Sequence, residues 1–415
     1  MRLTDIEQSM LAGEMGEPRR LAMEQQMRVG AFFDAEDFVE VSQAHLMADT
    51  ESLGDAGIAF LEKIAGYPAE QRRVRVPTVT DPRGIDLKAY KRLKQSESFA
   101  QRERRAISAL SALGVLMTDT CINYQTILPP LFGEHLAFGD TGSTIYANSV
   151  CGARSNFEGG PAALAAALTG RVPRYGFHLD RCRRGTRHFV LEDRPQTLSD
   201  WGVLGGIVGR HTESYWQVPV IDGLQEAPTS NQLKHFGAAL ASFGSVAMFH
   251  MLGVTPEAPE AGAVFDGPVP APEPITRADR DAFYASFAVS EDKIDVVVFA
   301  APQLSLFEMQ RLAGLLEGRS VHPKTALVVA TSPEIKSACD RMRLTATIED
   351  AGGIVLEGVC FYQMYARETG EANGWKTLMT NSAKLVNIIQ GYGYQPVLAP
   401  MERCVETAIK GRIVA

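Results

Sequence analysis

The chain has 415 residues, 45% of them hydrophobic, and a formal net charge of −8. This length and apolar content are enough for two or three buried cores, which predicts a globular protein of several domains. The charges are dispersed, and the densest basic cluster, residues 181–187, is expected to be a solvated turn, so nucleic acid is excluded as a partner. No apolar run approaches the ~20 residues that span a bilayer, which excludes a membrane partner.

The N-terminus and the cysteines indicate the compartment. Thr4 followed by Glu7 is the pattern of a helical capping box, not of a signal peptide. Six cysteines without regular spacing in a chain of this length do not indicate a disulfide framework. We therefore expect a cytoplasmic protein whose cysteines are free for packing or for metal.

Residues 1–254 are predicted to form an N-terminal α/β region. Helical periodicity occurs at 18–33, 58–65, 98–113 and 230–242, and strand-like runs occur at 38–46, 72–79, 115–117, 218–221 and 245–251. The run at 115–117 is followed by Thr118-Asp119-Thr120-Cys121, which places polar groups at the carboxyl end of a strand. In open α/β sheets, ligands bind at that end.

The chain is predicted to divide at residues 255–275. This stretch contains six prolines and too little apolar periodicity for a core, so we interpret it as a connector. Residues 276–415 then show short apolar runs at 294–300, 325–330, 353–356 and 396–398, with helical patterns at 304–316, 332–344, 381–390 and 401–410. Apolar runs with helical crossovers predict a C-terminal βα domain with a parallel sheet covered on both faces.

The stretch from Asp140 to Pro161 is a candidate ligand site. It combines the short polar side chains of Asn148, Ser149 and Asn156 with the Arg154 guanidinium and several glycines. Glycines let backbone N–H groups approach a ligand closely, and a helix starting at Pro161 adds a positive dipole end. The composition predicts a small-anion site, although a Gly/Asn/Ser surface loop has the same composition.

The segment at 148–161, Asn-Ser-Val-Cys-Gly-Ala-Arg-Ser-Asn-Phe-Glu-Gly-Gly-Pro, resembles the Asn-Ser-Val-Leu-Gly-Ala-Arg-Thr-Asn-Arg-Glu-Gly motif of the aconitase X family, the iron–sulfur hydro-lyases related to aconitase. Further motifs similar to those of this family follow one another along nearly the whole chain: Leu3-Thr4 with Gly13-Glu14, Thr120-Cys121 with Tyr124, Gly133-Glu134-His135, Tyr175-Gly176-Phe177-His178, Gly253-Val254-Thr255-Pro256-Glu257-Ala258, Thr380-Asn381-Ser382-Ala383-Lys384 and Cys404-Val405. The resemblance implies an aconitase-like α/β fold with two or more βα domains, built of mostly parallel sheets around a central cleft.

The resemblance also assigns the role of iron–sulfur cluster ligand to Cys121, Cys360 and Cys404. Three thiolates would leave one iron with an open position for a substrate oxygen. The number of irons is not predicted. Spacing alone does not indicate a cluster, because the chain has no Cys-x-x-Cys and free cysteines are commonly small buried hydrophobic residues.

Two departures from the family pattern concern this site. Where the family usually reads Cys-Pro-His, the chain has Ala301-Pro302-Gln303. The usual Asp-Thr-Cys around the second ligand is replaced by Gly358-Val359-Cys360. Both departures predict an altered cluster environment.

Dehydration of a hydroxy acid requires a grip on the carboxylate and groups that move a proton. Arg154 is predicted to bind the carboxylate with two hydrogen bonds, and Lys384 to add a positive charge. Asp140 is predicted either to receive a substrate ammonium or to act as an acid–base group, and His178 is a predicted proton shuttle. The predicted neutral donors to the substrate are Asn148, Ser149, Asn156 and Ser382. Each of these residues has an ordinary alternative: a solvated surface charge, a turn cap or a satisfied core histidine.

Enzymes of the aconitase type complete their site with a small swivelling domain that supplies a serine base, and the two regions assigned above leave no room for it. The resemblance therefore implies a separate small-subunit partner, with this chain as the large subunit. Of the family's substrate classes, we favour cis-3-hydroxy-L-proline, which is dehydrated to Δ1-pyrroline-2-carboxylate. Mevalonate 5-phosphate is the alternative substrate. We rank it second because no additional basic cluster lies near the motif to bind its phosphate.

Two further alternatives come from other classes of protein. Ala301 and Gln303 suggest a metal-free relative that only binds a small carboxylate. A nucleotide-dependent enzyme on a doubly wound fold is disfavoured, because the chain has neither a Gly-x-Gly-x-x-Gly after a strand nor a phosphate-loop Gly-Lys-Ser/Thr.

Overall fold

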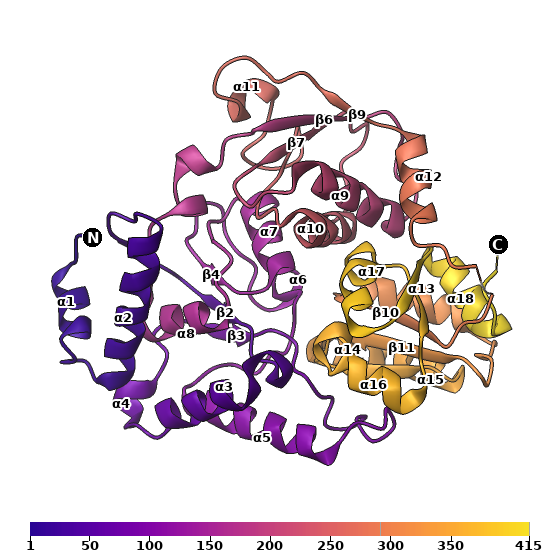
Figure 1. Ribbon diagram of the computed structural model, residues 1–415, viewed down its shortest axis with the longest axis horizontal. Coiled ribbons are helices and arrows are strands. Elements are labelled where there is room, and N and C mark those ends of the chain that lie inside the picture. Colours follow the sequence, from indigo (N-terminus) through magenta and orange to yellow (C-terminus); the bar gives the residue numbers. More distant parts are fainter. Residues whose placement is uncertain (291, 415) are drawn as a thin grey trace.

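The computed structural model of the chain describes residues 1–290 and 292–414. The strands form three parallel sheets, each in its own part of the chain, and one two-stranded antiparallel pair. Figure 1 shows the N-terminal part in indigo and purple, the middle part in magenta and salmon, and the C-terminal part in orange and yellow. The prediction of an α/β fold with mostly parallel sheets is confirmed.

The N-terminal part is built on a three-stranded sheet of order β3-β2-β4. Its strands are β1 (Phe38–Glu40), β2 (Ala44–Leu46), β3 (Thr78–Thr80), β4 (Ala137–Phe138) and β5 (Arg171–Pro173), of which β1 and β5 form the antiparallel pair. Its helices are α1 (Asp5–Leu11), α2 (Glu17–Phe32), α3 (Thr50–Ala65), α4 (Ala69–Arg72), α5 (Glu97–Ala112), α6 (Asn123–Thr126), α7 (Thr141–Ser149) and α8 (Gly160–Thr169). The predicted capping box at the start of α1 is present, because the Thr4 N–H donates to Glu7 Oε2 at 2.8 Å.

The middle part has a four-stranded parallel sheet of order β8-β7-β6-β9. Its strands are β6 (Arg187–Leu191), β7 (Pro219–Asp222), β8 (His250–Met251) and β9 (Glu273–Ile275), and its helices are α9 (Leu198–Thr212), α10 (Ser230–Gly244), α11 (Ala261–Val264) and α12 (Arg277–Ala285). The proline-rich residues 255–275 thus contain α11 and β9. Pro274 fits in β9 because this strand lies at the sheet edge, where a missing N–H is tolerated.

The C-terminal part has a five-stranded parallel sheet of order β12-β11-β10-β13-β14. Its strands are β10 (Val296–Leu304), β11 (Ala326–Thr331), β12 (Ile354–Glu357), β13 (Thr377–Thr380) and β14 (Gln395–Leu398). Its helices are α13 (Leu306–Leu316), α14 (Pro333–Arg341), α15 (Leu344–Asp350), α16 (Ala366–Asn373), α17 (Ala383–Ile389) and α18 (Met401–Lys410). The bounds of β10, β11, β12 and β14 agree with those of the predicted apolar runs to within a few residues.

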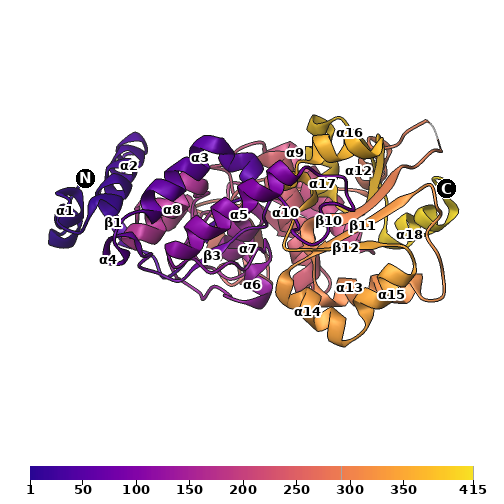
Figure 2. The same ribbon diagram turned by 90° about the horizontal axis from the view of Figure 1, so that it is seen from below.

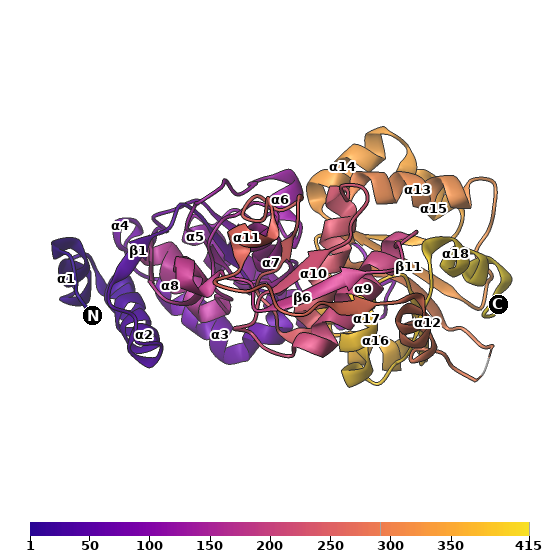
Figure 3. The same ribbon diagram turned by 90° about the horizontal axis from the view of Figure 1, so that it is seen from above.

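The middle and C-terminal parts are joined by one large apolar cluster, which includes Phe236 and Phe249 from the former and Val297 and Leu312 from the latter. The N-terminal part has a core of its own around Leu46, Ile64 and Leu164. In Figures 2 and 3, α1 and α2 lie at one end of the long axis and α18 lies towards the other. Among residues 1–290 and 292–414, no helix combines the length and apolar content that crossing a bilayer would take.

The segments that follow β3, in the first sheet, and β12, in the third sheet, lie side by side. Arg83, just after β3, forms a parallel bridge with Val359, just after β12, and its N–H donates to the Gly358 carbonyl at 2.9 Å. Loops that follow strands of both sheets therefore meet at this junction. Because ligands of parallel sheets bind at the carboxyl ends of the strands, a ligand site is expected here.

Candidate active site

Five ionisable side chains gather where these strand ends meet. Asp81 follows β3, Asp140 follows β4, Cys360 follows β12 and Lys384 lies in α17 after β13, while Cys121 comes from the loop before α6. All five are buried, with exposed fractions of 5% or less. Their charges act on one another, since Asp140, Cys121, Cys360 and Asp81 all influence the pKa of Lys384.

Lys384 and Asp140 form an ion pair within this cluster. Lys384 Nζ lies 3.4 Å from Asp140 Oδ1, and Asp140 Oδ2 accepts the Ser143 N–H at 2.8 Å as the N-cap of α7. Burial alone would raise the pKa of Asp140, but the Lys384 ammonium, His45 and the Ser143 N–H hold it below its usual range. Burial opposes the charge of Lys384 as well, yet the carboxylate of Asp140 raises the pKa of Lys384 to about 12. The pair is therefore ionised at neutral pH.

Asp81 was not predicted from the sequence. Its Oδ2 accepts from Gln363 Nε2 at 3.0 Å, whereas its Oδ1 has no hydrogen-bond partner within the described part of the chain. Burial and the nearby Asp140 carboxylate raise the pKa of Asp81 well above its usual range. Asp81 thus has a raised pKa beside Asp140, whose pKa is lowered, and carboxyl groups whose pKa values are pushed apart can divide the tasks of proton donor and charge-stabilising group.

His45 in β2 completes this acid cluster. Its Nε2 is 2.8 Å from the Thr120 carbonyl and 3.6 Å from Asp81 Oδ1. Burial lowers the pKa of His45, which disfavours a charged pair between His45 and Asp81. The only sequence signal for Asp81 was its place directly after the strand-like run at 72–79, the same strand-end rule that singled out Cys121.

Cys121 and Cys360 come together. The Cys360 thiol, and then burial, raise the pKa of Cys121. Gln303, fully buried, links the two cysteine-bearing loops, since its Nε2 lies 3.1 Å from the Asp119 carbonyl and 3.2 Å from the Val359 carbonyl. Two of the three predicted thiol ligands therefore share a site.

Cys404 lies elsewhere. It is buried in α18, which follows β14 at one edge of the C-terminal sheet, whereas Cys360 follows β12 at the opposite edge. Its Sγ is 3.4 Å from the Ala399 carbonyl, and burial raises its pKa although Arg403 acts in the opposite direction. Four strand spacings of ~4.8 Å separate the two edges.

These residues do not fit a cluster held by the three predicted cysteines. Within residues 1–290 and 292–414, no group of three or more His, Cys, Asp or Glu side chains is placed to hold a metal ion. Ala301, two residues before Gln303 and 1% exposed, presents a methyl group where the family usually has a cysteine.

Arg154 and His178 form a second cluster, with His135. Arg154 donates to Asp180 Oδ1 at 2.5 Å and to the His178 carbonyl at 3.2 Å. His178 Nδ1 lies 2.9 Å from His135 Nδ1, and burial, followed by His135, holds the pKa of His178 well below its usual range. The groups that influence His178 include neither Lys384 nor the thiols. Arg154 is thus paired within this second cluster, and its joint action with Lys384 on one carboxylate stays a prediction.

The predicted neutral donors have partners within the fold. Asn148 Nδ2 donates to the Ser155 and Ala247 carbonyls, both at 2.9 Å, and its Oδ1 accepts the Ser155 N–H. Ser149 Oγ accepts the Phe249 N–H at 2.9 Å, and Asn156 Nδ2 donates to the Tyr175 carbonyl at 3.1 Å. These contacts hold the loop in shape, and a role of the three residues in substrate binding stays a prediction.

Ser382 is the residue of this group that touches the thiol site. Its Oγ caps α17 by accepting the Leu385 N–H at 3.1 Å, and it donates to the Ala301 carbonyl. Lys384 is two residues further along the same helix. Ser382 therefore fixes both the start of the helix that carries Lys384 and the backbone before Gln303.

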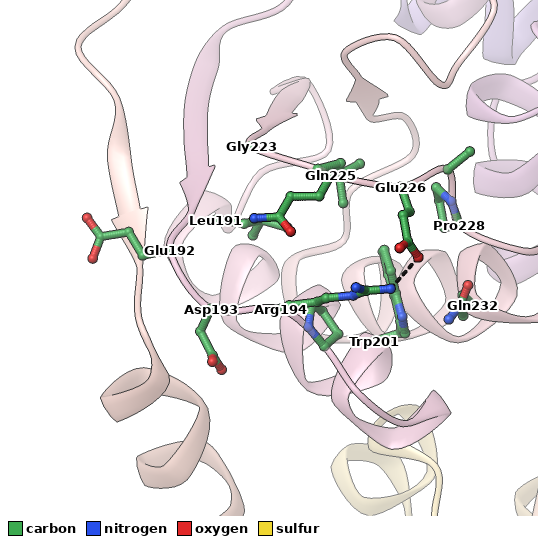
Figure 4. Close-up of a pocket in the computed structure, with 13 residues that line it drawn as sticks. Leu191, Glu192, Asp193, Arg194, Trp201, Gly223, Gln225, Glu226, Pro228 and Gln232 are labelled. Carbon is green, nitrogen blue, oxygen red and sulfur yellow. Dashed lines mark hydrogen bonds and ion pairs between the residues drawn. The ribbon is translucent and has the colours of Figure 1, made fainter.

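A separate pocket opens at the carboxyl ends of β6 and β7. Figure 4 shows the Arg194–Glu226 ion pair across it, with Trp201 and Gln232 on the same wall. Among the described residues, the buried Trp201 indole N–H has no hydrogen-bond partner. None of the predicted site residues lines this pocket.

Three parallel sheets, with two aspartates, a lysine and two thiols buried at strand ends of the first and third, indicate an aconitase-like α/β enzyme. Family models for the first, second and third domains of aconitase X match residues 1–181, 185–285 and 294–410. The chain belongs to the aconitase X family.

Comparisons with individual proteins support this family assignment. The phosphomevalonate dehydratase large subunit of Methanothermobacter thermautotrophicus is 37% identical over 392 residues, which cover 94% of each chain. The cis-3-hydroxy-L-proline dehydratase of Pseudomonas aeruginosa is 34% identical over 419 residues, covering 99% of this chain and 70% of the relative. The crystal structure of Thermococcus kodakaraensis aconitase X in its holo-form superposes with a TM-score of 0.87 at 29% identity, covering 98% of this chain and all of that one. The prediction of a hydro-lyase of this family is confirmed at that level.

Proposed function

We propose that this chain is the large subunit of a dehydratase that removes water from a small hydroxy acid. The observation that carries the proposal is the ionised Lys384–Asp140 pair beside the neutral Asp81, all three buried at the carboxyl ends of parallel strands. Relatives named as dehydratases support the reaction class.

In this proposal each group of the cluster has one task. Lys384 binds the substrate carboxylate and stabilises the negative charge that develops on it when the adjacent carbon loses its proton to a base on the partner subunit. The electron pair of that C–H bond forms the double bond, and the C–O bond breaks with its electrons on oxygen. Asp81 gives its proton to the departing oxygen, so that water leaves and Asp81 becomes a carboxylate.

The proposed substrate is cis-3-hydroxy-L-proline. Asp140 is ionised, and its buried carboxylate attracts the substrate's ammonium nitrogen. Asp140 is the proposed partner of that nitrogen. The product would be Δ1-pyrroline-2-carboxylate, after the initial double bond rearranges.

Mevalonate 5-phosphate is the second candidate substrate. The relative that is 37% identical is named for phosphomevalonate. Arg154 and Arg183 carry the positive charge such a phosphate needs, but they are paired with Asp180 and Glu257. A phosphate would have to displace these carboxylates, which is why we place it second.

The cofactor and the compartment stay proposals as well. Membership of the aconitase X family supports an iron–sulfur cluster, while Ala301 supports the metal-free alternative. All six cysteines are free thiols, which supports a reducing compartment such as the cytoplasm. The small subunit is supported by the names of the relatives that this chain matches along most of their length.

Coexpression with a small open reading frame next to the gene tests the proposal. The complex, purified without oxygen, is incubated with cis-3-hydroxy-L-proline and, separately, with mevalonate 5-phosphate, and iron and sulfide are measured. Loss of water from hydroxyproline is the expected result. If the complex turns over mevalonate 5-phosphate and not hydroxyproline, mevalonate 5-phosphate becomes the assigned substrate. If the complex contains no iron and binds hydroxyproline without turning it over, the chain is a carboxylate-binding protein.

A further inference from the structure

Three large apolar side chains are exposed on the short segment between α6 and β4. The exposed fractions are 39% for Ile127, 70% for Leu131 and 68% for Phe132. We call these three residues the Leu131 patch. Single exposed apolar residues are ordinary on protein surfaces, but a contiguous group on one short segment is typical of an interaction site.

The segment that carries the patch is held in a fixed shape. The Leu131 N–H donates to Glu134 Oε2 at 2.7 Å, the Glu134 N–H donates to the Leu131 carbonyl at 3.2 Å, and Gly133 N–H donates to the Gly152 carbonyl at 2.9 Å. Glu134 is itself held by the Ser42 hydroxyl. Hydrogen bonds thus order the backbone that presents two large apolar side chains to water, which lowers the entropic cost of binding a partner there.

The patch borders the candidate active site. α6 starts two residues after Cys121, and Thr126 Oγ1 at its end donates to Glu334 Oε1 of α14 at 2.8 Å. Figures 1, 2 and 3 all show α6 beside α14, at the junction of the N-terminal and C-terminal parts. On its other side, the Phe132 ring packs so closely on Gly152 that a Cβ at that position would overlap it. A protein bound to the patch would therefore lie against the loops that carry Cys121 and Arg154.

We propose that the Leu131 patch is the docking surface for the small subunit of the dehydratase, an inference that rests on the proposed function. This chain spans 94% of a relative named a large subunit but only 70% of the cis-3-hydroxy-L-proline dehydratase of Pseudomonas aeruginosa, whose name mentions no subunit. That dehydratase thus has additional residues that this chain does not match. A second polypeptide that supplies the corresponding domain has to seat beside the active site, and the ordered apolar patch is placed there.

Binding of the purified small subunit to the intact chain tests the proposal. Leu131→Asp and the double variant Leu131→Asp/Phe132→Asp are compared with Phe32→Asp, whose side chain is 80% exposed on α2 at the far end of the molecule (Figure 2). Sedimentation velocity should show affinity at least tenfold weaker for both patch variants and unchanged for Phe32→Asp. Thermal melting checks that each variant is folded.

Hydrogen exchange of the wild-type chain gives a measurement that does not depend on the variants. Amides of residues 127–134 should exchange more slowly once the small subunit is bound, while those of α12 should not change. If the wild-type chain binds no small subunit, the two-subunit function and the docking surface both fail. If the double variant still binds the small subunit tightly, or if residues 127–134 show no protection, the docking-surface proposal fails while the two-subunit function stands. A dimer of this chain that Leu131→Asp dissociates would assign the patch to a second copy and likewise overturn the proposal.

Discussion

Cys121 and Gln303 bond to each other twice. The Cys121 N–H donates to Gln303 Oε1 at 3.3 Å, and the Gln303 N–H donates to Cys121 Sγ at 3.5 Å. The Gln303 Nε2 also contacts the carbonyls of both cysteine-bearing loops and the Thr331 carbonyl at the end of β11. One carboxamide, at the position where the family usually has a histidine, thus holds the thiol site together.

Replacing Gln303 should loosen this site. Gln303→Ala leaves the Cys121 N–H and several carbonyls buried without a partner, and each unpaired group costs about 1–3 kcal/mol. We expect a loss of about 3 kcal/mol in the free energy of unfolding, measured by urea denaturation, together with faster alkylation of Cys121. Gln8→Ala is the control, because Gln8 makes one exposed hydrogen bond. Unchanged stability and unchanged alkylation would contradict the clamping role.

Restoring a thiol at Ala301 should change metal binding. Ala301 is buried and lies two residues from the Gln303 that contacts Cys121, so Ala301→Cys adds a third sulfur to the pair. After anaerobic reconstitution with iron and sulfide, we expect more iron per chain in Ala301→Cys than in the wild type, because three thiolates hold a cluster better than two. Ala313→Cys, in the buried face of α13, is the control. Equal iron in the three proteins would show that position 301 does not reach the metal.

Glu308 of α13 should be among the most sensitive positions for stability. It pairs with Lys234 and lies 2.7 Å from His235 Nε2, both on α10, and all three are buried. Burial opposes its charge, but Lys234 and His235 hold the pKa of Glu308 below its usual range. Glu308→Gln leaves the Lys234 ammonium buried without a countercharge, for an expected loss of about 3–5 kcal/mol.

The matched control is Glu402→Gln, which removes the half-exposed partner of Arg311. Surface pairs contribute about 0–1 kcal/mol, so the melting temperature of this variant should barely move. Because the pKa of Glu308 is lowered on folding, its stabilisation is present above the ordinary carboxyl pKa and is lost only in acid. Equal effects of the two substitutions would mean that the buried pair does not stabilise the contact between the middle and C-terminal parts.

Stability should fall between acidic and neutral pH because of Glu103. Burial raises the pKa of Glu103 to about 7, although its carboxylate accepts from Thr50 Oγ1 at 2.8 Å. A raised carboxyl pKa stabilises the fold below the ordinary pKa, and this contribution is lost as the pH rises through the folded value. Over this window the loss from Glu103 is about 3 kcal/mol. Glu103→Gln should flatten the pH dependence of the free energy of unfolding, and an unaltered slope would contradict the assignment.

The sequence predicted the elements that local interactions determine, and it did not predict contacts between residues far apart in the chain. α18 begins and ends where its helical pattern does, because an amphipathic helix is encoded locally. β13 was not predicted, since four residues ending in threonine give little signal. Local composition could not tell that Arg154 pairs with Asp180, which follows α8 and β5, or that Cys404 lies across the sheet from Cys360. Such placements depend on long-range topology.

Asp81 is the position at which activity and stability should respond in opposite directions. Asp81→Asn keeps the shape and the hydrogen bond to Gln363 but cannot give a proton to the departing oxygen, so we expect kcat to fall about 100-fold. Burial and Asp140 raise the pKa of Asp81, so the carboxyl stabilises the fold at low pH and this contribution is lost as the pH rises. Above neutral pH, the variant should therefore be at least as stable as the wild type.

Asp49→Asn provides the matched control for Asp81→Asn. Like Asp81, Asp49 is fully buried, and one of its carboxyl oxygens has no hydrogen-bond partner among the described residues. Burial raises the pKa of Asp49 as well. Unlike Asp81, Asp49 caps α3 by accepting the Ser52 N–H at 2.8 Å. Asparagine caps helices as well as aspartate does, so this variant should keep its activity. The wild-type rate should decline as the pH rises through the pKa of Asp81, and Asp49→Asn should show the same decline. Asp81→Asn should lack it, because the proton whose loss causes the decline is absent; an identical pH profile in all three proteins would remove Asp81 from the reaction.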